Sequence, residues 1–259
     1  MSAFRPKLWT VAGLALTLAA CGGEQGGEAG KAGEAGAAPT AASGEGEGGE
    51  GEGGEGHAAG AGEAGAVQAY ANVPAESRTA LRLAHLKGFF LAAQAVAPSE
   101  GADAAAALAG QGVLEVYEPE AAALKAAGVD EAALRAAAQS GDPAALKSTI
   151  ATLDAASRKA GGDNAVVVRH LASMSAGMYG EATKGGAIDP VEYQHAYGAA
   201  LAAKALADSD PKLAPVRADL QKLVALWPSP TAPADAAKAA KPGQVLAQAS
   251  RVELALSGA

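Results

Sequence analysis

Three aspartate–proline pairs divide the second half of this chain at spacings suited to helices. They are Asp142-Pro143, Asp189-Pro190 and Asp210-Pro211. Aspartate is a favoured N-cap, and proline is favoured at the first helical position, where its missing N–H and fixed φ are tolerated. Each pair therefore predicts the start of a helix, and this pattern constrains the fold more than any other feature of the sequence.

Turn-forming residues mark the other boundaries, and no segment alternates with period two for long enough to form a strand. The best strand candidate, Val166–Val168, continues into Leu171 and Met174 at helical spacing. We therefore expect one all-α domain over residues 67–259, built as a helical bundle or as stacked helical hairpins. The expected helices cover residues 74–97, 100–128 with interruptions at 110–112 and 119, 130–140, 142–161, 163–184, 189–208, 210–227 and 243–257, with a Pro/Ala/Lys linker at 228–242.

The domain is rich in alanine, which lets helices approach closely but buries little area for each residue. Larger apolar side chains must therefore supply most of the core. Those expected to do so are Leu81, Leu83, Phe89, Phe90, Leu114, Tyr117, Leu124, Leu134, Leu146, Ile150, Leu153, Leu201, Leu220, Leu223 and Leu226.

The first 21 residues have the order of a secretory signal. Arg5 and Lys7 form a basic start, residues 8–18 form an apolar stretch too short to span a membrane, and Leu18-Ala19-Ala20-Cys21 closes it. This ending resembles the lipobox of bacterial lipoproteins. The resemblance implies a signal peptide at residues 1–20, a diacylglyceryl group on the sulfur of Cys21, and an acyl chain such as palmitate on the new amino terminus.

Anchoring through Cys21 sets the expected location. Stable attachment needs more than one acyl chain, because each buried methylene contributes only about 0.8 kcal/mol. In proteobacterial lipoproteins an aspartate after the lipidated cysteine retains the protein in the inner membrane, whereas this chain has Gly22. The resemblance therefore implies a protein of the bacterial cell envelope, anchored in the lipid membrane, with the outer membrane facing the periplasm favoured over the inner membrane. Since Cys21 is the sole cysteine, no disulfide or cysteine metal ligand is available to the domain.

Residues 21–66 follow the signal as a lipidated cysteine and a Gly/Glu/Ala tether. From residue 22 they hold nine glutamates against one lysine, and alanine is their only aliphatic residue. Such a segment cannot bury enough apolar surface to offset its ordering entropy, so we expect it to be disordered. A flexible chain of this length reaches roughly 35–40 Å, enough to hold a domain clear of the lipid surface.

Charge and motifs exclude several classes of function. The net charge of −8 belongs to the tether, because residues 67–259 hold 17 Lys and Arg against 19 Asp and Glu. There is no basic patch interleaved with aromatic residues, so we expect no nucleic-acid partner. There is also no Gly-x-Ser-x-Gly or His-Glu-x-x-His motif. We therefore do not expect an enzyme.

Two helices carry candidate metal ligands. His170, Met174 and Met178 are four residues apart, which places them on one stripe of a helix, and imidazole and thioether ligands suit copper or haem iron. The alternative is a core stripe with one hydrogen-bonded histidine. The next expected helix carries Glu192 and His195, a Glu-x-x-His spacing found in di-iron bundles.

The second set is incomplete, because di-iron bundles use two copies of that motif with two further glutamates. Glu115 or Glu118 is the possible carboxylate partner, and the alternative is an exposed Glu192 beside a half-buried His195. If the helices around residues 184–189 are antiparallel neighbours, a metal or haem site is expected at Met174, Met178 and His195. His170 would then lie at its far edge, and the metal would be iron or copper.

A short stretch supports an iron-linked role by resemblance. Tyr179, the small residues that follow it, and Glu192-Tyr193 resemble the periplasmic helical extension of bacterial iron permeases over residues 179–193. The resemblance implies an envelope role linked to iron and assigns no ligand.

Together these observations predict a lipid-anchored envelope protein whose helical domain is a binding or accessory module, and the candidate ligands favour a metal or haem as what it handles. The alternative is a structural or assembly factor that docks another envelope protein without a ligand.

Overall fold

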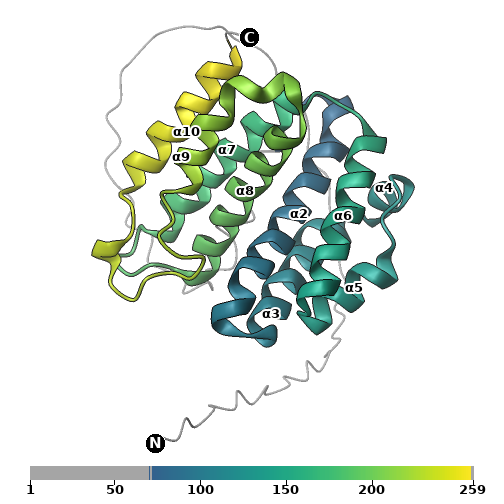
Figure 1. Cartoon of the computed structure of the whole chain (residues 1–259), viewed down its shortest axis with the longest axis horizontal. Coiled ribbons are helices and arrows are strands. Elements are labelled where there is room, and N and C mark those ends of the chain that lie inside the picture. The colour runs from purple at the N-terminus through teal and green to yellow at the C-terminus, as the bar shows by residue number, and fades with distance from the viewer. Residues whose placement is uncertain (1–69, 71, 258–259) are drawn as a thin grey trace, which may run out of the picture. The chain divides into compact units, whose positions relative to one another are not determined.

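The structure, a computed structural model, describes Tyr70 and residues 72–257. The signal peptide, Cys21 and the expected tether lie outside the described residues. Within that described part every regular element is a helix and no strand occurs, which confirms the all-α class. Apart from the short α4, the described α-helices form two groups of four, which lie on the right and on the left in Figure 1.

The first group surrounds one hydrophobic core. It contains α2 (Ala75–Glu100), α3 (Ala102–Gly112), α5 (Glu131–Ser140) and α6 (Pro143–Ala160). Each helix packs against the next, and α6 closes the ring on α2. A π-helical turn η1 (Val113–Tyr117), a 3₁₀ turn η2 (Glu118–Glu120) and the short α4 (Ala121–Ala126) connect α3 to α5.

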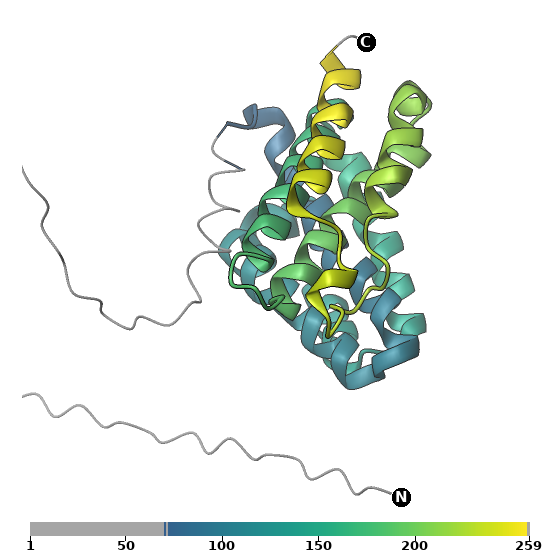
Figure 2. The ribbon, with the colours of Figure 1, turned by 90° about the vertical axis from the view of Figure 1, so that its left-hand side faces the viewer.

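The second group has the same ring arrangement. It contains α7 (Asn164–Ala182), α8 (Pro190–Ser209), α9 (Arg217–Val224) and α10 (Pro242–Ser257), and α10 closes the ring on α7. The 3₁₀ turn η3 (Pro211–Val216) precedes α9, and η4 (Ala236–Lys238) lies in the connection between α9 and α10. In Figure 2 this connection is the yellow-green loop below those two helices.

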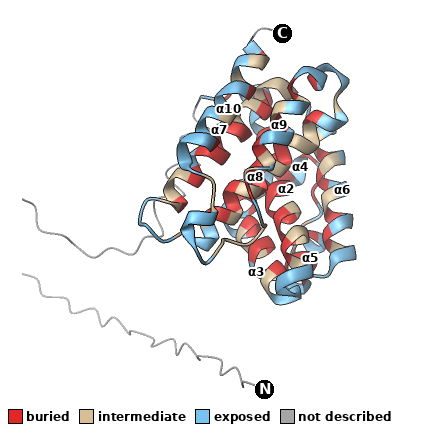
Figure 3. Ribbon diagram, turned by 60° about the vertical axis from the view of Figure 1, so that its left-hand side comes forward, coloured by how far each residue is buried: buried red, intermediate tan, exposed pale blue. Residues whose placement is uncertain are grey.

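The two groups meet where α2 crosses α8. Gly88 and Gly198 form the contact, and a Cβ built on Gly198 would lie 2.6 Å from the carbonyl oxygen of Gly88. The absence of side chains at both positions lets the two backbones touch. Figure 3 shows the buried faces of α2 and α8 turned towards this junction and towards the two cores.

Local capping explains where the helices begin. The carboxylates of Asp142 and Asp189 each accept hydrogen bonds from two backbone N–H groups of the following turn, as the aspartate–proline pairs predict. Asp130 and Asp163 cap α5 and α7 in the same way, each through one bond.

Three expectations about elements need correction. Helix α2 does not end before Pro98; its last turn closes because Ser99 Oγ donates to the Val96 carbonyl and the Gly101 N–H donates to that of Ala97. The helix expected over residues 210–227 begins as the 3₁₀ turn η3, since Pro215 has no N–H for an α-helical bond. The connection at residues 228–242 contains the short η4.

The expected core is largely correct, with one error. Leu114 is 60% exposed because the π-helical turn directs it outwards, while Val113, Val116 and Tyr117 of the same turn are buried. Ile150, Leu201 and Leu226 are only partly buried. Among the described residues, no helix combines the length and apolar character needed to cross a membrane.

Candidate functional site

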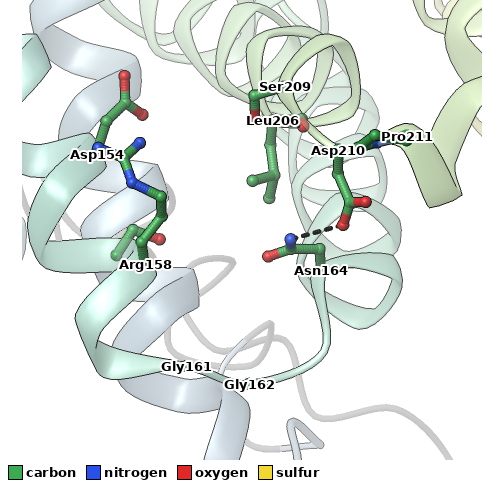
Figure 4. Close-up of a pocket in the computed structure, with 10 residues that line it drawn as sticks. Asp154, Arg158, Gly161, Gly162, Asn164, Leu206, Ser209, Asp210 and Pro211 are labelled. Carbon is green, nitrogen blue, oxygen red and sulfur yellow. Dashed lines mark hydrogen bonds between the residues drawn. The ribbon is translucent and has the colours of Figure 1, made fainter.

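A pocket of about 310 Å³ lies where the loop from α6 to α7 approaches the end of α8. Its volume is at the lower end of the range for small-molecule sites. Figure 4 shows Asp154 and Arg158 of α6 on one wall, and Leu206, Ser209 and Asp210 on the other. The remaining lining residues are Ser157, Gly161, Gly162, Asn164 and Pro211.

The α6 wall is fixed from behind by a buried lysine. Lys87 of α2 is 8% exposed, and its Nζ donates to Asp154 Oδ1 at 2.5 Å. This pair neutralises the Asp154 carboxylate and holds it in place. Arg158, one helical turn further along, is exposed and forms no hydrogen bond or ion pair with another described residue. Its guanidinium is therefore the uncompensated positive charge of this wall.

The opposite wall carries the negative charge of Asp210, which has no ion pair with a cationic side chain of the described residues, although Lys212 and Arg217 lie near enough to lower its pKa. Asp210 Oδ2 accepts from Asn164 Nδ2 at 2.8 Å, and Asp210 Oδ1 accepts from the backbone N–H of Lys212 at 2.9 Å. These hydrogen bonds, the first of them most strongly, lower the pKa of Asp210. Asp210 is thus ionised at neutral pH, and neither of its two carboxylate contacts is with a cationic side chain.

The floor of the pocket depends on two glycines. Gly161 and Gly162 have φ values of 72° and 100°, which side chains rarely adopt. A Cβ on Gly162 would also lie 2.9 Å from the carbonyl oxygen of Glu76. The chain can therefore turn tightly from α6 into α7 and keep both pocket walls close to each other.

The structure places the predicted metal ligands of α7 in two environments. Met174 and Met178 are buried in the core of the second helix group. His170 is half-buried, and its pKa is lowered by burial and by the neighbouring Arg169, while Glu253 of α10 acts in the opposite direction. This arrangement resembles the core stripe that was the alternative to a metal site.

The predicted ligands of α8 face elsewhere. His195 is 6% exposed, its Nε2 lies 3.0 Å from Gln111 Oε1, and its ring packs against Phe89 at 4.6 Å between centroids. Its Nδ1 lies 3.9 Å from a carboxylate oxygen of Glu115. These partners belong to α3, α2 and η1. These contacts of His195 are therefore with the first helix group, and none of them is with Met174 or Met178.

Glu192 is half-buried near Asp189 and Glu181. Burial is the largest cause that raises the pKa of Glu192, and the two neighbouring carboxylates raise it further. Glu118, the other possible partner, instead pairs with Arg135 at 2.9 Å. In residues 70 and 72–257, no group of three or more His, Cys, Asp and Glu side chains is arranged to hold a metal ion. Binding of iron, copper or haem therefore stays a prediction from the sequence.

The residues that resemble the iron permease extension pack in an aromatic cluster. Tyr179 packs edge-to-face against Trp227 at 5.1 Å between centroids, and the ring of Tyr193 is tilted towards Trp227 at 6.3 Å. The hydroxyl of Tyr179 donates to the carbonyl of Ala240, and that of Tyr193 to the carbonyl of Ser229. In the structure these tyrosines fasten the connection between α9 and α10.

Sequence reasoning missed an internal repeat that relates α2 to α8. Residues 85–100 and 195–210 align without a gap, with eight of sixteen positions identical. The identical pairs are His85/His195, Gly88/Gly198, Leu91/Leu201, Ala92/Ala202, Ala93/Ala203, Ala95/Ala205, Ala97/Ala207 and Ser99/Ser209. Both segments lie at the junction of the two helix groups, because α2 and α8 pack against each other.

The repeat brings two buried histidines to the junction. His85 is 3% exposed, its Nδ1 lies 2.5 Å from the Tyr70 hydroxyl, and its Nε2 has no hydrogen-bond partner among the described residues. The ring of Phe89 lies between His85 and His195, 5.2 and 4.6 Å from them. Burial lowers the pKa of His85 to about 3 and that of His195 to about 4.

Comparison with known proteins gives no match to a family model, a curated protein or a solved structure.

Proposed function

We propose that this chain is a lipid-anchored protein of the bacterial cell envelope, whose helical domain binds a small polar molecule in the pocket between α6 and α8. The observation that carries the binding function is the pair of fixed carboxylates on facing walls, Asp154 and Asp210, with the unpaired guanidinium of Arg158 beside the first. Side chains held in place before a ligand arrives lose less entropy when it binds.

The anchor part of the proposal depends on the lipobox at residues 18–21. A protein tethered to a membrane by two or more acyl chains remains in the compartment where it meets its ligand. The long acidic segment after Cys21 would let the domain reach away from the lipid surface.

The alternative is an assembly factor that docks another envelope protein. The observation that favours it is the exposure of Leu246 and Leu254 on the outside of α10, at 61% and 74%. A Leu246→Ser, Leu254→Ser chain separates the two functions, because the binding module would keep its small ligand and the assembly factor would lose its partner.

Replacing Cys21 by alanine should abolish lipidation, since no other thiol is present to accept the diacylglyceryl group. Metabolic labelling with an alkyne-bearing fatty acid, followed by fractionation of the envelope, measures the effect. We expect the label to disappear and the protein to leave the membrane fraction. A Ser2→Ala chain, changed in the signal far from the cleavage site, should label normally. Undiminished labelling of the Cys21→Ala chain would contradict the anchor.

A further inference from the structure

The pocket between α6 and α8 has walls of opposite charge. On the α6 side the Lys87–Asp154 pair cancels, which leaves the positive charge of Arg158. On the other side Asp210 is ionised, and its carboxylate accepts hydrogen bonds from Asn164 and a backbone N–H, while Arg217 donates to its backbone carbonyl. The three charged lining residues Asp154, Arg158 and Asp210 together with Lys87 carry no net charge.

From this charge arrangement we infer that the ligand is a small zwitterion of the amino-acid type, with its carboxylate at Arg158 and its ammonium group at Asp210. This inference depends on the proposed binding function and deepens it. A guanidinium recognises a carboxylate through two parallel N–H donors, and a carboxylate accepts well from an ammonium group. Ser157, whose hydroxyl has no hydrogen-bond partner among the described residues, offers an additional polar contact.

Other ligand classes fit these walls less well. A multiply charged anion such as phosphate would be repelled by the carboxylates of Asp154 and Asp210, and Arg158 is the one lining cation that would attract it. A divalent cation would meet Arg158 and would need oxygen ligands from several sides, whereas Asp154 and Asp210 are each engaged in other bonds. A purely apolar ligand would leave Arg158 and Asp210 desolvated and unpaired.

Isothermal titration calorimetry of the full acylated protein in detergent micelles tests this inference. The probes are the common L-amino acids, sodium acetate, ethylammonium chloride and inorganic phosphate. We expect at least one amino acid to bind at least about tenfold more tightly than acetate or ethylammonium, because each of these carries one of the two charges. Arg158→Gln and Asp210→Asn should each weaken amino-acid binding about tenfold or more.

Two control variants keep the test specific. Lys159→Gln removes a neighbouring exposed cation that does not line the pocket, and Asp208→Asn removes a neighbouring carboxylate that pairs with Lys204. Both should bind within about twofold of the unchanged protein. Asparagine at position 210 can still cap η3, and circular dichroism of each variant confirms that the fold is retained.

The outcomes separate the ligand class from the binding function. If phosphate or a singly charged probe binds most tightly, and its binding is weakened by Arg158→Gln, the ligand is not a zwitterion. That result would contradict the inference while supporting the proposed binding function. Equal loss of affinity in Arg158→Gln and Lys159→Gln would place the ligand outside the pocket and overturn the inference. Absence of binding by every probe would contradict both proposals.

Discussion

Replacing Gly198 by alanine should lower the free energy of unfolding by about 2 kcal/mol or more, and the melting temperature by roughly 5–10 °C. The added methyl group would lie 2.6 Å from the Gly88 carbonyl oxygen and 2.9 Å from its carbon, and both are backbone atoms that cannot rotate away. Helices α2 and α8 would have to separate, which loosens both cores at once. This cost outweighs the gain of about 1 kcal/mol that alanine brings to a helix interior.

The matched control is Gly180→Ala on α7, where an added Cβ meets nothing within 4 Å. That variant should be neutral or more stable by up to about 1 kcal/mol. Urea unfolding followed by circular dichroism compares the two. If the Gly198→Ala protein is as stable as the Gly180→Ala protein, the backbones of α2 and α8 do not approach each other as closely as the structure shows.

Acidification should destabilise the domain steeply, by roughly 2–3 kcal/mol for each pH unit between about pH 6 and pH 4. His85 and His195 have folded pKa values of about 3 and about 4, while the unfolded chain has the ordinary value of 6.5. The unfolded state therefore binds more protons in this window, so the stability is complete above pH 6.5 and is lost as the pH falls towards the folded values.

The groups around the two histidines decide the size of this effect. Tyr70 and Phe89 carry no charge, and His195 disfavours protonation of His85. Glu115, 3.9 Å from His195, and Asp189 favour the charged form and moderate the loss. The raised pKa of Glu192 contributes in the opposite direction, because its neutral form is preferred in the folded state.

Urea unfolding at half-unit steps from pH 7 to pH 4 measures the slope. In the His85→Phe, His195→Phe double variant the free energy of unfolding should depend less steeply on pH, by about the whole contribution of the two histidines. This holds even if the double variant is less stable at pH 7. The His170→Phe control should keep most of the slope, since His170 is only half-buried. An unchanged slope in the double variant would show that other groups cause the acid sensitivity.

Helix boundaries were accessible from the sequence because capping is local. The carboxylates of Asp142, Asp163 and Asp189 bond N–H groups two or three residues away, so neighbours in the sequence define the structure. Prediction failed where a second constraint acted. Pro98 lies within the last turn of α2, and Pro215 holds the start of the following segment in a 3₁₀ turn.

The sites were less accessible, because their residues are joined only by tertiary packing. Spacing on one helix correctly places His170, Met174 and Met178 on α7 but says nothing of what each side chain faces. His195 instead reaches Gln111, 84 residues away. In the same way the pocket joins Asp154 within α6, Asn164 at the start of α7 and Asp210 at the end of α8. The repeat that pairs His85 with His195 was visible in the sequence, and it would have pointed to the junction of α2 and α8.

Native mass spectrometry of the protein extracted from its own membranes, with the tightest-binding amino acid in the buffer, tests the central claim most directly. We predict a chain that begins at Cys21, carries covalent acyl groups and holds one amino acid that leaves at raised collision energy. Arg158→Gln should keep the acyl groups and lose the amino acid, while Lys159→Gln should keep both. An unacylated chain, or an amino acid retained equally in both variants, would contradict the account.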